Sequence, residues 1–140
     1  MPREVLRSDR VWDPARVYHP GHDYAQPFSQ AVKAVGKEMI FVSGQVALDA
    51  NGNVVGADDM GAQARQALMN LKAILEAGGV TLADVVKLTV YVTDMSRFAE
   101  VQAVRGEFWA GIPLPASTAL EIKRLVRKEF LVEIEAIAVR

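Results

Sequence analysis

Two segments of the chain, residues 84–93 and 130–139, alternate as β-strands do but carry apolar residues on both faces. Side chains of a strand point alternately to its two faces, so one face of each segment can supply a core. The faces expected to pack inward are formed by Val86, Leu88, Val90 and Val92, and by Phe130, Val132, Ile134, Ala136 and Ala138. The opposite faces mix apolar and polar side chains, namely Val85, Lys87, Thr89, Tyr91 and Thr93, and Leu131, Glu133, Glu135, Ile137 and Val139.

A sheet face of this mixed kind is too apolar to sit comfortably in water and too polar for a dry core. Contact with another subunit accommodates both properties, so the pattern predicts a homo-oligomer whose open sheet faces pack together. A monomer with a mixed surface is the alternative, because single apolar residues are common on protein surfaces.

Between the strands the apolar spacing changes to three and four, which indicates amphipathic helices over residues 58–77 and roughly 96–110. Strands are expected at 28–35, 38–43, 84–93, 116–123 and 130–139, with the first two joined in a hairpin at Gly36 and Lys37. Two helices can cover only one face of such a sheet. The predicted fold class is therefore α+β, a mainly antiparallel sheet with two helices on one face.

The composition excludes several classes of protein. The chain has 140 residues, enough for one domain, and 51% of them are hydrophobic, so it is not a disordered chain. It has no cysteine, which excludes a disulfide scaffold, a thiol nucleophile and a cysteine-ligated metal. Its net charge of −1 argues against a basic nucleic-acid-binding domain.

The first part of the chain differs from the rest. Residues 1–26 combine prolines and scattered charges without a clean period, and they are expected to form an extended N-terminal arm before a domain over 27–140. These residues contain no apolar secretory segment, and the most apolar uncharged stretch, residues 39–48, is too short to span a bilayer. We therefore expect a cytoplasmic protein without a membrane partner.

Candidate catalytic residues are few. Glu133 and Glu135 share one face of the last strand, where a half-buried carboxylate can position or activate a water. A solvated or ion-paired sheet edge is the alternative. Ser43 and Gly44 end an earlier strand, where a glycine lets a ligand approach the backbone closely or simply marks a bulge.

Two groups of cationic or titratable residues have simpler explanations. His19 and His22 are general-base candidates, but two histidines without further ligands at helical spacing are a weak metal signal, and solvated arm residues explain them. The basic cluster formed by Lys123, Arg124, Arg127 and Lys128 can hold an anion or an RNA phosphate. It contains no stacking aromatic residue, so a charged hairpin tip is favoured and nucleic acid is not expected as a partner.

Several segments, taken in order, resemble the RidA/YjgF family of enamine and imine deaminases. The resembling segments are FVSGQ at 41–45, AQARQAL at 62–68, NLKAI at 70–74, VVKLTVYVTD at 85–94 and VEIEAIA at 132–138. The resemblance covers residues 27–140 and leaves out the arm.

The resemblance implies a chorismate-mutase-like α+β subunit and a homotrimer with small-molecule clefts between subunits. Members of the family hydrolyse 2-imino or enamine acids to 2-keto acids and ammonia without a cofactor or a metal. Carried over to this sequence, the glutamate that orients a water corresponds to Glu133. The serine and glycine that line the cleft correspond to Ser43 and Gly44.

The sequence departs from the family where substrate should bind. The deaminases carry Pro-Ala-Arg-Ser before the penultimate strand, but the run here ends in Ser117 and Thr118, so a serine replaces the arginine that grips the substrate carboxylate. A site tyrosine corresponds to Phe28 and a site asparagine to Gln102. A serine hydroxyl cannot replace a bidentate arginine–carboxylate contact, which is worth about 1.5–3 kcal/mol.

Four interpretations stay open. The substrate is an imine without a neighbouring carboxylate, or another cation takes over, with Arg105, Arg124, His19 and His22 as candidates. Alternatively, the chain is a non-catalytic small-molecule binder, or a ribonuclease or translation inhibitor. We favour a trimeric hydrolase of the enamine/imine deaminase type acting on a non-standard substrate. Whether it is an enzyme is left for experiment to decide.

Overall fold

The computed structural model describes residues 3–7, 10, 28–29 and 31–140. Its elements, in chain order, are β1 (Arg3–Leu6), β2 (Ala31–Ala34), β3 (Met39–Gln45), α1 (Met60–Ala77), η1 (Leu82–Asp84), β4 (Val85–Val92), η2 (Met95–Arg97), α2 (Phe98–Phe108), β5 (Ala116–Glu121) and β6 (Val132–Val139).

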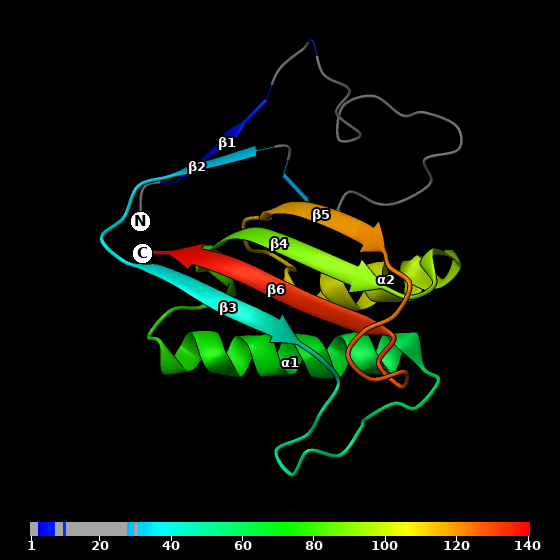
Figure 1. Ribbon diagram of the computed structural model, residues 1–140. Helices are drawn as coiled ribbons and strands as arrows, with labels where there is room; N and C mark the ends of the chain where they lie inside the picture. Colours follow the sequence, from blue (N-terminus) through cyan, green and yellow to red (C-terminus); the bar gives the residue numbers. More distant parts are fainter. Residues whose placement is uncertain (1–2, 8–9, 11–27, 30) are drawn as a thin grey trace.

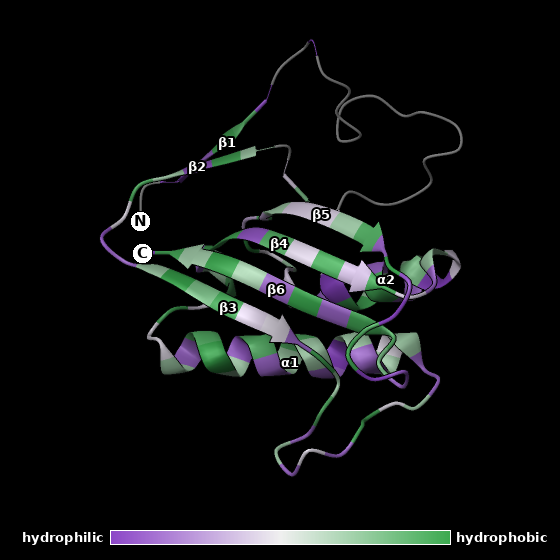
Figure 2. Cartoon of the chain, in the orientation of Figure 1, coloured by the Kyte–Doolittle hydropathy of each residue, from purple (hydrophilic) through white to green (hydrophobic). Residues whose placement is uncertain are grey.

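The main sheet has the strand order β3-β6-β4-β5, and its β4–β5 pair is parallel while its other pairs are antiparallel. Helix α1 packs on β3, β6 and α2, so both helices lie over one face of the sheet (Figure 1). The predicted fold class is confirmed: an α+β subunit with a mainly antiparallel sheet and two helices on one face. Apolar and polar residues alternate as bands along β4 and β6 (Figure 2).

Helix α1 matches the predicted range closely, because its ends are encoded by capping residues. Asp59 is its N-cap and accepts a hydrogen bond from the Ala62 backbone N–H, which satisfies one of the free donors of the first turn. Gly78 is its C-cap, and Gly79, the next residue, lies in the left-handed region with φ of 75°. The face toward the sheet buries Leu68, Leu71 and Leu75 completely.

The expected phase of β4 is wrong at its first two residues. Val85 is fully buried and Val86 is not, although the alternation places Val86 on the inner face. The register with β6 shifts between Val85 and Lys87. Such a β-bulge adds one residue to one strand. The residues before the bulge therefore alternate in the opposite phase from those after it, which turns Val85 inward in place of Val86.

The expected hairpin between residues 28–35 and 38–43 is also wrong. Strand β2 pairs antiparallel with β1, and the backbone N–H groups of Lys37 and Glu38 donate to the Arg140 carbonyl instead of closing a turn. Strand β1 falls within the stretch expected to be an extended arm. Its Arg3 guanidinium donates to the carbonyls of Ala83, Val85 and Leu114, at 2.6 to 3.0 Å, which fixes this strand on the domain.

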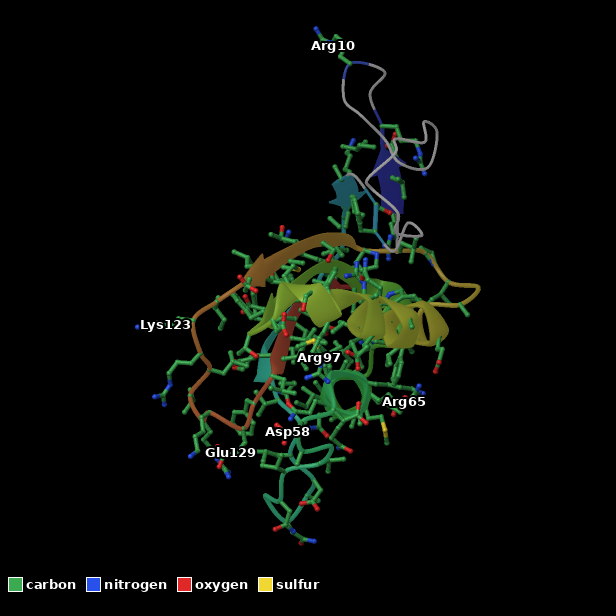
Figure 3. All side chains as sticks on the ribbon, turned by 90° about the vertical axis from the view of Figure 1, so that its right-hand side faces the viewer. Arg10, Asp58, Arg65, Arg97, Lys123 and Glu129 are labelled. Carbon is green, nitrogen blue, oxygen red and sulfur yellow. The ribbon has the colours of Figure 1, made fainter. Side chains whose placement is uncertain are left out.

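The basic cluster does not lie at a hairpin tip. Strands β5 and β6 are not neighbours, because β4 lies between them, so the residues that join them form a longer loop. Lys123 projects from the outer side of this loop, away from the helices (Figure 3). The guanidinium of Arg127 lies 5.2 Å from the centre of the Phe130 ring and pairs with Glu129 at 3.7 Å.

Candidate functional site

A pocket lies between helix α2 and the edge strand β5, on the helix-covered side of the sheet. Its volume is about 270 Å³, and we call it the α2–β5 pocket. It is lined by Phe28, Met95, Phe98, Gln102, Arg105, Ser117 and Ala119. Phe98, Gln102 and Arg105 are spaced four and three residues apart, so they share one face of α2. Ser117 and Ala119 are alternate residues of β5, so they share one face of that strand.

Phe28 reaches this pocket because the next residue is tied to the chain just before β5. The backbone N–H of Ser29 donates to the Pro115 carbonyl at 2.8 Å, and its hydroxyl donates to the Leu114 carbonyl at 2.7 Å. Ser29 is itself buried. These two hydrogen bonds fix the backbone at residue 29 and hold the Phe28 ring at the pocket wall.

The pocket holds two polar groups that suit ligand binding. The Gln102 Oε1 atom is buried and accepts no hydrogen bond within the part of the chain that the structure describes, so a ligand N–H or O–H would satisfy it. The Arg105 side chain is only 2% exposed, and burial lowers its pKa to about 10. A group with that pKa still carries its positive charge at neutral pH.

The structure separates the four cations considered as substitutes for the missing arginine. Arg105 lines the same pocket as Ser117. Arg124 lies in the loop between β5 and β6, where its guanidinium donates to the carbonyls of Leu125 and Val126. His19 and His22 lie outside the described residues.

A second group of expected site residues meets at the end of β3. The register of β3 against β6 shifts between Val42 and Gln45, so Ser43 and Gly44 form an irregularity next to Glu133. A Cβ atom placed on Gly44 would overlap the Glu133 carboxylate. The glycine is therefore required there so that the carboxylate can lie against the backbone.

The two groups lie on opposite faces of the sheet. Ser117 is in register with the buried Leu88, whereas Glu133 is in register with Tyr91 on the face that the helices leave open. Within one chain, then, the structure joins Phe28, Gln102 and Ser117, and separately Gly44 and Glu133. Thr118 belongs to neither group, because it lies on the open face with its hydroxyl 2.6 Å from the Lys87 ammonium.

The open face keeps large apolar side chains in contact with solvent. Phe41 is 69% exposed and Met39 is 59% exposed, both on the edge strand β3. Phe41, Lys87, Thr89 and Glu135 line a shallow cavity of about 160 Å³ on this face. Exposed aromatic and aliphatic groups beside charged ones are typical of subunit interfaces.

A tyrosine on the open face gives a testable pH dependence. The Tyr91 hydroxyl donates to Glu135 Oε1 at 2.6 Å, and this bond, desolvation and the charges of Glu135 and Glu133 raise the Tyr91 pKa above 10.0. The folded chain holds the Tyr91 proton more tightly than the unfolded chain does. The hydroxyl therefore adds to the free energy of unfolding at pH values below the ordinary tyrosine pKa, and this contribution is lost as the pH rises through the raised Tyr91 pKa.

The near-ultraviolet absorbance of the wild type and of the Tyr91→Phe variant is titrated with base, and the difference between the two curves reports Tyr91. The midpoint of this difference curve is expected to lie above 10.0. Glu135→Gln keeps an oxygen acceptor but removes a charge, so it should bring this midpoint down. A midpoint at or below the ordinary value would contradict the hydrogen bond.

No group of three or more histidine or acidic side chains within residues 3–7, 10, 28–29 and 31–140 is arranged to hold a metal ion. Over the same residues, neither helix has the length and hydropathy needed to cross a membrane.

Part of the pocket is not predicted from the sequence. Arg105 is expected there only as one of several substitute cations, and Met95, Phe98 and Ala119 are not expected at any site. The signal for the helix residues was the spacing of Phe98, Gln102 and Arg105, which places them on one face of α2.

Comparisons with known proteins identify the family. The family described as Endoribonuclease L-PSP, which contains the RidA/YjgF proteins, matches residues 21–140. The chain is 46% identical over 112 residues to a RutC family protein of Pyrococcus horikoshii, covering 80% of this chain and 86% of that protein. It is 45% identical over 104 residues to the 2-iminobutanoate/2-iminopropanoate deaminase of Salmonella typhimurium, and the match covers 73% of this chain and 80% of that protein.

A solved structure extends the similarity to the whole chain. A Rid family protein of unknown function from Yersinia pestis is 34% identical, with a TM-score of 0.86 and complete coverage of both chains. The chain belongs to the RidA/YjgF family.

Proposed function

We propose that this protein is a homotrimeric hydrolase of imines or enamines. A water oxygen adds to the imine carbon, protons pass to the nitrogen, and the carbon–nitrogen bond breaks to release ammonia and leave a carbonyl. The reaction needs no redox change, because water supplies the oxygen and both hydrogens. Water, a carboxylate and a substrate pocket are sufficient for it.

The observation that carries the proposal is the position of the Glu133 carboxylate against Gly44 on the open face. A positioned carboxylate can accept a proton from a water as that water attacks, and general-base catalysis of this kind contributes about 100- to 10,000-fold. The Salmonella typhimurium relative, 45% identical, is a deaminase of two small imino acids, which supports the same reaction type.

The proposal places each active site between two subunits. Glu133 and the α2–β5 pocket lie on opposite faces of one sheet, so one chain cannot apply both to the same substrate. In a cyclic oligomer each subunit presents one surface to its neighbour and another to the next subunit. A trimer of this kind would bring Glu133, Ser43 and Gly44 of one subunit to the pocket of another. The exposed Phe41 and Met39 would be covered at the same time.

A non-catalytic binding protein is the second candidate. It is favoured by Ser117, which leaves the edge strand without the arginine of the resembling deaminases. We do not propose a ribonuclease, because Lys123 of the basic loop projects away from the helix-covered side that holds the pocket (Figure 3).

The test is hydrolysis of freshly generated 2-imino acids with the full chain. Small apolar imino acids are made in the assay by an amino acid oxidase, and ammonia release is followed against the spontaneous rate. The proposal predicts a rate above the spontaneous one for at least one substrate. Spontaneous rates for the whole series, together with measurable binding of 2-keto acids, would establish the binding protein instead.

A further inference from the structure

The α2–β5 pocket is apolar over most of its described wall. Phe28, Met95, Phe98 and Ala119 supply hydrocarbon surface, and Ser117 supplies a neutral hydroxyl from the edge strand. A carboxylate that leaves water for such a wall loses its hydration, and a single hydroxyl does not replace it. This part of the wall therefore disfavours an anionic ligand.

One charged side chain lines the pocket among the described residues, and its charge is accounted for within the chain. Arg105 is 2% exposed and already takes part in an interaction with another part of the protein. A buried cation is retained where partners inside the fold offset its loss of hydration. We therefore do not assign the Arg105 charge to a ligand.

The amide of Gln102 adds a requirement of its own. Its Oε1 atom is buried and has no hydrogen-bond partner within the described part of the chain, and the residue lines the pocket. An acceptor of this kind is satisfied by a ligand that donates a hydrogen bond. An imine or enamine nitrogen carries such an N–H, whereas an ionised carboxylate has only acceptor oxygens.

We propose that this pocket takes imines and enamines whose reacting carbon carries small apolar groups and no carboxylate. The inference deepens the proposed function and rests on it, because it takes the pocket as the substrate half of the active site. In the shared site, the Glu133 carboxylate already brings one negative charge to the substrate, and a second carboxylate beside it would be repelled. The volume of about 270 Å³ suits a small molecule.

The assignment also gives the reaction a place in a sequence of reactions. Water adds its oxygen to the imine carbon, both of its hydrogens pass to the nitrogen, and the carbon–nitrogen bond breaks to leave an aldehyde or ketone and ammonia. Imines of this kind form when a primary amine is oxidised, so amine oxidation is the class of reaction that would supply the substrate. In the hydrolysis test, 2-imino acids are then the poorer substrates and imines made by an amine oxidase the better ones.

Equilibrium binding tests the substrate class without requiring catalysis. The probes are isobutyramide, which has a planar carbon bearing an N–H donor, and isobutyrate, which has nearly the same shape with a charge and no donor. Ligand-observed NMR titration of the wild-type chain is expected to give at least about 10-fold tighter binding of the amide, because the acid buries an unpaired charge. The ketone 3-methyl-2-butanone lacks the donor, so it should bind about 3- to 10-fold more weakly than the amide, the range for one hydrogen bond.

Three variants then locate the preference. Ser117→Arg puts a guanidinium on the pocket wall and is expected to reverse the preference in favour of isobutyrate. Val126→Arg adds the same charge on the β5–β6 loop, at a side chain that is 83% exposed and outside the pocket, and should leave the preference unchanged. Gln102→Leu should lower the affinity for the amide to that for the ketone. Circular dichroism and thermal unfolding confirm that each variant is folded.

The possible results separate this inference from the proposed function. Equal or tighter binding of isobutyrate by the wild type would overturn the inference, and so would a lack of binding by all three probes. A folded Ser117→Arg variant that still prefers the amide would show that the preference does not arise in this pocket, which overturns it as well. If the amide is preferred and no imine is hydrolysed, the ligand class stands and the proposed catalytic function fails. If 2-imino acids are hydrolysed and the acid is preferred, the proposed function stands and this inference fails.

Discussion

Replacing Glu133 with glutamine is expected to lower the rate of imine hydrolysis by about 100- to 10,000-fold, the range that a general base contributes. The amide has the size of the carboxylate and still fits against Gly44, so the fold and the pocket should be unaffected. It cannot accept the proton of an attacking water at neutral pH. Ammonia release under saturating substrate is the measurement, because the loss should appear in kcat.

Two further variants serve as controls. Glu135→Gln changes a carboxylate on the same strand and the same face, and its amide oxygen can still accept the Tyr91 hydrogen bond, so its rate should stay within a few-fold of wild type. Gly44→Ala retains Glu133 but puts a methyl group where its carboxylate lies, so it should also lower kcat. Full activity of Glu133→Gln would remove Glu133 from the mechanism.

Replacing Gln63 with leucine is expected to destabilise the fold by about 3–5 kcal/mol, because three backbone groups lose their partners together. Gln63 is fully buried in α1. Its amide donates to the carbonyls of Gly56 and Glu129, and its oxygen accepts from the Leu131 N–H at 2.8 Å. One side chain therefore joins the loop before α1 to the chain entering β6.

Urea unfolding at a fixed protein concentration measures this loss, because oligomer stability depends on concentration. Gln66→Leu is the matched control on the same helix, three residues later. Its amide donates to Asn70 and, at 3.4 Å, to the Leu48 carbonyl, so its loss should cost less than about 1 kcal/mol. Similar unfolding midpoints for the two variants would show that the Gln63 hydrogen bonds contribute little.

Local patterns predicted the elements of this fold that have strong periodicity. The α1 range follows from apolar residues at helical spacing and ends at two glycines, and these signals depend only on neighbours in sequence. The pairing of β1 with β2 was not predictable in the same way. Its partner segments are four residues each and lie more than 20 residues apart, and Arg3 is held by carbonyls 80 or more positions away. Such contacts leave no local pattern.

The candidate site was predicted in composition but not in arrangement. Phe28, Gln102 and Ser117 do meet in one pocket, and Gly44 does lie against Glu133. The separation of these two groups depends on the strand order and on the parallel register of β4 with β5, which the sequence did not specify. Arg105 was hard to single out because buried arginines are rare, and the helical pattern alone does not distinguish the pocket face.

Complementation between two inactive variants tests the shared site most directly. Glu133→Gln removes the water-positioning carboxylate, and Ser117→Trp fills the pocket with an indole ring. The two chains are co-expressed in equal amounts, and ammonia release is compared with that of each variant alone. If each site takes Glu133 from one subunit and the pocket from its neighbour, about one quarter of the sites in randomly mixed oligomers are intact, so roughly one quarter of wild-type activity should return. Mixed oligomers with no more activity than the separate variants would contradict a site shared between subunits.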